Sequence, residues 1–78
     1  YHWEKDPHAD EAVCCLSGAT RLCLRAVQPG TPDEVVRLLP GQAVVVPRDR
    51  WHRFELEEPT DLLALTLRHG TQLERTTT

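Results

Sequence analysis

Short apolar runs alternate with turn-forming residues along the whole chain, at a spacing typical of antiparallel β-structure. Strand-compatible runs cover residues 1–6, 11–16, 20–27, 34–39, 43–46, 51–56 and 61–67. Turn formers such as Ser17-Gly18 and Pro40-Gly41 separate them. No segment repeats its apolar residues at the helical period. The pattern therefore predicts an all-β, antiparallel domain with almost no helix.

The parity of side chains within each run predicts which face is buried. Leu22 and Leu24 alternate with polar or charged neighbours, which predicts one buried and one wetted face. His52 and Phe54 are two positions apart and therefore share a face. The run 61–67 is apolar on both faces, which predicts that it lies between two layers or at a subunit interface.

The length of the chain limits it to one domain. With 78 residues, we expect a single domain over 1–70 and a polar C-terminal tail over 71–78. A chain this short buries only about 60% of its unfolded surface, so we expect additional support from a homodimer. The first residue is Tyr1 rather than Met, and we expect the chain to be part of a longer protein.

Charge and cysteine content exclude several classes of partner. The formal net charge of −3 argues against a nucleic-acid surface. No apolar run approaches the ~20 residues that span a bilayer, so no membrane association is expected. The chain has three cysteines, an odd number, and they lack the spacing of a disulfide framework. We therefore expect reduced, buried thiols and a cytoplasmic location.

Two stretches of the sequence resemble the paired motifs of the cupin family. From Gly41 the chain continues with five residues, Pro47, one residue, Asp49, two residues and His52. This is similar to the family pattern of Gly, five residues, Pro, one residue, Gly, two residues and His. Asp49 replaces the second glycine, and Asp enters left-handed turns more easily than most residues.

The first motif lies upstream of the second and supplies its acidic partner. Glu11, Leu16 and Gly18 have the order and spacing of the family's Glu…Leu-x-Gly. The two motifs and the interval between them cover residues 3–52. The resemblance implies an antiparallel double-stranded β-helix, a jelly-roll-like cupin barrel, with His52 and Glu11 facing one pocket.

The resemblance also implies a metal site, from which this chain departs. When Trp3 is aligned with the aromatic residue before the family's His-x-His pair, the two histidines become Glu4 and Asp6. The implied ligand set is then His52, Glu11, Glu4 and Asp6, and the implied pocket adds Phe54 as a wall. Three carboxylates and one imidazole form an oxygen-rich site that suits Mn or Mg better than Zn or Cu. His8 is an alternative ligand if the chain bulges at Pro7.

Three functions stay open at this point. The favoured one is a small-molecule-binding module with a degenerate metal site and an unknown ligand. The alternative is a metal-dependent cupin enzyme, a dioxygenase, isomerase or lyase. In that enzyme His52 and the pocket carboxylates would hold a divalent cation (Mn, Fe, Ni or Zn) that polarises a substrate oxygen. A third option is an accessory partner of a larger complex.

Overall fold

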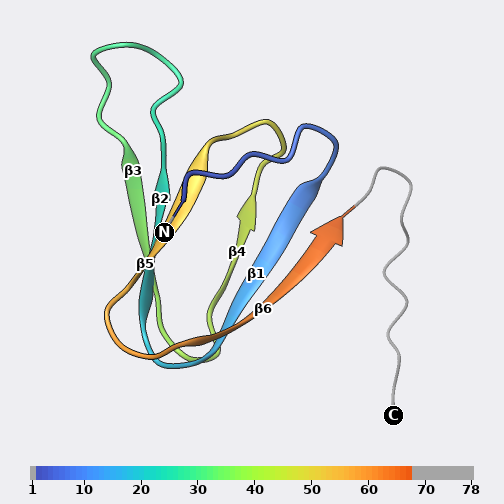
Figure 1. The fold of residues 1–78 in the computed structure, drawn as a ribbon, viewed down its shortest axis with the longest axis vertical. Coiled ribbons are helices and arrows are strands. Elements are labelled where there is room, and N and C mark those ends of the chain that lie inside the picture. Colours follow the sequence, from blue (N-terminus) through green and yellow to red (C-terminus); the bar gives the residue numbers. More distant parts are fainter. Residues whose placement is uncertain (1, 68–78) are drawn as a thin grey trace.

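The computed structural model describes residues 2–67, which form two antiparallel β-sheets (Figure 1). The strands are β1 (Asp10–Ser17), β2 (Thr20–Leu24), β3 (Glu34–Leu38), β4 (Ala43–Val46), β5 (His52–Leu56) and β6 (Asp61–Leu67). One sheet has the order β4-β1-β6 and the other β3-β2-β5, and neither sheet closes on itself. The described residues contain no helix, so the prediction of an all-β chain is confirmed. Accordingly, residues 2–67 include no helix that could cross a membrane.

The hydrophobic core lies between the two sheets. Val13 and Val46 come from one sheet, and Leu22 and Leu24 from the other, and none of the four is more than 6% exposed. Four partly buried side chains pack around them: Val36, Val44, Phe54 and Leu62. Alternate residues of each strand therefore point inward, as the period-two pattern predicted.

The order of the strands explains how distant residues come together. Every connection except β2–β3 passes from one sheet to the other. Glu11 on β1 is paired with Val46 on β4, and Leu24 on β2 is paired with His52 on β5. The two motif residues Glu11 and His52 therefore lie on opposite sheets.

Several predicted boundaries shift in the structure. The predicted strand over residues 1–6 is reduced to a single bridge between Glu4 and His52. Pro7 carries no backbone donor, and the Asp6 side chain turns the chain there. The strand predicted to continue to Val27 ends at Leu24. The predicted domain end at 70 and the tail 71–78 lie outside the described residues.

The outer face of the β4-β1-β6 sheet is apolar, and residues 2–67 place no second layer over it. The strand registers place Val45, Ala12 and Leu65 in one row, and Ala43, Cys14 and Leu63 in the next. We call these six residues the outer apolar face. Leu63 and Leu65 are 58% and 50% exposed, so residues 2–67 leave the outward side of the run 61–67 uncovered.

The cysteines are free thiols that differ in burial. Cys15 and Cys23 are buried, as predicted, whereas Cys14 is half-buried. Cys14 belongs to the outer apolar face, over which the described part of the chain places no second layer.

Candidate functional site

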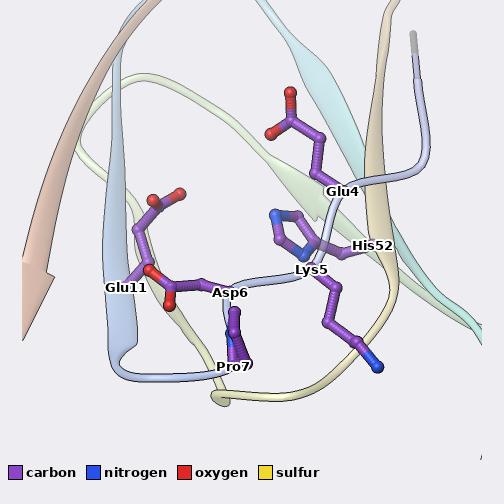
Figure 2. A pocket seen from close by; sticks show the side chains of 6 residues that line it. All are labelled: Glu4, Lys5, Asp6, Pro7, Glu11 and His52. Carbon is purple, nitrogen blue, oxygen red and sulfur yellow. The ribbon is translucent and has the colours of Figure 1, made fainter.

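A pocket of about 450 Å³ lies where the N-terminal segment, β1 and β5 meet (Figure 2). Its lining consists of Glu4, Lys5, Asp6, Pro7, Glu11 and His52. The four polar residues that the sequence assigned to one pocket, Glu4, Asp6, Glu11 and His52, all line it. Its volume falls within the roughly 300–1,000 Å³ range of small-molecule sites.

Backbone hydrogen bonds hold the N-terminal segment against β5. The Glu4 amide donates to the His52 carbonyl at 2.8 Å, and the His52 amide donates to the Glu4 carbonyl at 2.9 Å. Further along, the Asp49 amide donates to the Asp6 carbonyl at 2.6 Å. Asp49 has a φ of 63°, the left-handed conformation expected where the cupin pattern has glycine. These contacts place Glu4 and Asp6 beside the imidazole.

His52 presents a free ring nitrogen at the pocket. The residue is only 5% exposed, and its Nδ1 lies 3.1 Å from the Arg50 carbonyl oxygen. A carbonyl only accepts hydrogen bonds, so this contact assigns the ring hydrogen to Nδ1 and leaves Nε2 of the neutral ring as an acceptor. Nε2 is buried and has no partner within residues 2–67. An unsatisfied buried polar atom costs about 1–3 kcal/mol, and a ligand that donates to it recovers that cost.

The carboxylates around the imidazole are not neutralised by a neighbouring cation. Glu4, Asp6 and Glu11 form no ion pair with another residue of the described chain. The lining cation, Lys5, lies 3.4 Å from the carboxylate of Asp49. Figure 2 shows its side chain running away from the carboxylates. The pocket is therefore acidic.

Asp6 is the carboxylate with a fixed orientation. Its Oδ1 accepts hydrogen bonds from the backbone amides of His8 at 2.8 Å and Ala9 at 3.3 Å. This local turn reverses the chain towards β1 and brings Asp6 next to Glu11 (Figure 2). The same turn leaves His8 exposed and off the pocket lining.

Phe54 does not line the pocket, although the sequence placed it there. Its half-buried side chain packs against the core. Its ring meets the imidazole of His52 edge-on, with 6.2 Å between centroids and an interplanar angle of 83°. Phe54 therefore supports the imidazole from the core side.

The predicted metal ligands do not form a metal site in this structure. Within residues 2–67, no group of three or more His, Cys, Asp or Glu side chains is arranged to hold a metal ion. The set of Glu4, Asp6, Glu11 and His52 shares a pocket without the close convergence that a cation requires. We therefore derive no step through a metal.

A stack of cations and indoles anchors the N-terminal segment, and the sequence reading missed it. The Arg25 guanidinium lies 4.4 Å from the Trp3 ring centroid and 5.4 Å from that of Trp51. Arg53 lies 4.8 Å from the Trp3 ring and Lys5 5.1 Å from the Trp51 ring. Trp51 is 40% exposed, and its ring lies against the cations of Arg25 and Lys5.

We expect Arg25→Met to loosen the N-terminal segment. The substitution keeps an apolar stem but removes the guanidinium between the two indoles, costing about 1 kcal/mol of unfolding free energy. Both tryptophans of the chain belong to this stack, so tryptophan emission reports on it directly and should shift to longer wavelength. Arg21→Met, on β2 and not in contact with either indole, is the control. Equal emission from both variants would contradict the anchoring role.

Comparisons with family models, with curated proteins and with solved structures found no match. The resemblance to cupins therefore rests on the two sequence motifs.

Proposed function

We propose that this domain is a binding module for a small polar organic molecule, held in the pocket at His52. The observation that carries the proposal is the buried Nε2 atom of His52. His52 is a lining residue of the pocket, and its Nε2 has no partner within residues 2–67. Folded proteins pair nearly all of their buried polar atoms. An unpaired acceptor beside a pocket of about 450 Å³ supports a ligand-binding role.

We further propose that the two sheets belong to a cupin-type barrel. Glu11 and His52 come from opposite sheets and line one pocket, as the resemblance implies. The repeated passage of the chain between the sheets supports the same assignment. Because a fold of this type hosts many activities, the assignment alone does not select an enzyme. The lack of a fitting metal set in the described chain favours binding over metal-dependent catalysis.

The proposal is tested by screening a chemically mixed set of small amines, alcohols, amides and carboxylates with 15N-labelled protein. We expect at least one compound class to shift the backbone amide signals of Lys5, Asp6, Glu11 and His52 together. His52→Phe should weaken that binding by about tenfold or more, the loss of one well-placed hydrogen bond in a buried site.

The matched control is His8→Phe, the same substitution at an exposed histidine outside the lining. It should leave binding unchanged. Because His52→Phe also removes the partner of the Arg50 carbonyl, Glu11→Gln provides a second variant that spares the core. A screen in which no compound class moves the pocket signals would refute the proposed function.

A further inference from the structure

We propose that the ligand is a small organic cation with N–H donors, a protonated primary or secondary amine. Its N–H group donates to Nε2 of His52, and its charge lies among the carboxylates of Glu4, Asp6 and Glu11. This inference rests on the proposed function and specifies the chemical class that the same pocket takes.

The side chains that line the pocket are rich in hydrogen-bond acceptors and poor in donors. In the neutral form of the His52 ring, Nδ1 donates to the Arg50 carbonyl and Nε2 is an acceptor. Ionised carboxylates are acceptors only. Among the lining side chains, the remaining donor is the Lys5 ammonium, which lies 3.4 Å from Asp49 and faces the Trp51 ring. The lining therefore offers acceptors, and a complementary ligand has to bring the donors.

The side chains that line the pocket carry an excess of negative charge. Three carboxylates and one ammonium line the pocket, so negative charge is in excess by two. Asp6 and Glu11 are partly buried, which strengthens their field relative to bulk water. An anionic ligand would meet like charge and further acceptors. A cation is attracted and forms charge-assisted hydrogen bonds.

The geometry and volume of the pocket suit an organic cation better than a bare metal ion. The described residues supply no group arranged as metal ligands. The volume of about 450 Å³ is also far larger than one ion needs, since even a water molecule takes only about 30 Å³. An ammonium group on a carbon framework fills such a space and tolerates acceptors that are spread around it. Pro7 and the stem of Lys5 offer apolar contact to the framework.

The test uses four probes that share one ring: benzylamine, benzyl alcohol, benzoate and benzyltrimethylammonium. Each is titrated into 15N-labelled protein at neutral pH, and the amide signals of the lining residues are followed with the ring nitrogens of His52. We expect benzylamine to bind about tenfold or more tightly than benzyl alcohol, because its hydrogen bonds are charge-assisted. Benzoate should not bind. Benzyltrimethylammonium carries the charge but no N–H donor, so it should bind more weakly than benzylamine and leave the Nε2 signal unmoved.

A pair of matched variants checks the role of the carboxylates. Glu11→Gln should weaken benzylamine binding by about tenfold and benzyl alcohol binding by a smaller factor, because only the amine loses a charge-assisted hydrogen bond. Glu58→Gln makes the same change at an exposed site outside the lining and should alter neither.

The outcomes separate this inference from the proposed function. Pocket binding of benzyl alcohol or benzoate as tight as that of benzylamine would overturn the amine assignment and leave a binding module standing. If benzyltrimethylammonium binds as tightly as benzylamine, the hydrogen bond to Nε2 of His52 does not contribute to binding. Failure of benzylamine to bind overturns the inference, and the mixed screen then decides on the function itself.

Discussion

Gly18→Ala should prevent stable folding. Gly18 has a φ of +86°, which an L side chain rarely adopts. A Cβ atom there would overlap the carbonyl oxygen of Pro59 and lie 2.7 Å from Oγ1 and 2.8 Å from Cα of Thr60. The β1–β2 and β5–β6 connections meet at this point, where Thr60 Oγ1 and the Glu57 amide both donate to the Ala19 carbonyl at 3.0 Å. The Pro59–Thr60 segment therefore leaves the new methyl group no room.

Gly41→Ala is the control that isolates this steric contribution. Gly41 has the same φ of +86°, but a Cβ there would meet nothing within 4 Å. The left-handed conformation alone costs about 1–2 kcal/mol, whereas overlap with backbone should add about 3 kcal/mol or more at Gly18. The unfolding free energies follow from chemical denaturation monitored by tryptophan fluorescence. Equal losses for the two variants would show that the close packing of the two connections is unimportant.

The strands were predictable because their signals are local. Period-two alternation and turn formers such as Gly18 and Gly41 act over a few residues, and both glycines adopt the left-handed conformation. The shared pocket of Glu11 and His52 was implied by the resemblance to the cupin motifs, whose spacing is also a local feature of the chain. These features depend only on neighbouring residues, so a single sequence is sufficient to find them.

The finer features of the pocket depend on contacts between distant segments. Parity shows that Phe54 shares a face with His52, but it does not show where along β5 the pocket ends and the core begins. The donor role of Nδ1 depends on the Arg50 carbonyl, a backbone group without a sequence signal. The indole and guanidinium stack requires the N-terminal segment to lie along β5, which brings Trp3 to Arg25 across 22 positions of the chain. Such contacts are consequences of the tertiary fold.

We propose that two copies of the chain associate through the outer apolar face. The two rows of this face contain no charged or hydrogen-bonding side chain apart from the Cys14 thiol. Beyond the rows, Asp10 accepts from the Arg48 amide and Asp61 accepts from Ser17. An apolar centre with polar ends is the usual anatomy of a subunit interface.

A second copy is the occupant that suits this surface best. A two-fold axis brings identical patches together, and pairing two uncharged faces buries no unpaired charge. A single copy leaves Leu63, Leu65 and Val45 each at least half exposed, a contiguous patch of the kind that marks interaction sites. A second copy also supplies a layer over the outward side of β1, which residues 2–67 leave without one.

Sedimentation velocity at micromolar concentration should therefore show a homodimer. The double variant Leu63→Lys/Leu65→Lys should sediment as a monomer and keep its β-type circular dichroism, because both side chains already lie in solvent within one chain. Val35→Lys places the same charge at a residue that is 59% exposed on β3, in the other sheet, and should remain dimeric. A monomeric parent protein, or a parent and double variant with the same mass, would contradict the pairing. If only the Val35→Lys control dissociates into monomers, the interface lies on the β3-β2-β5 sheet and not on the outer apolar face.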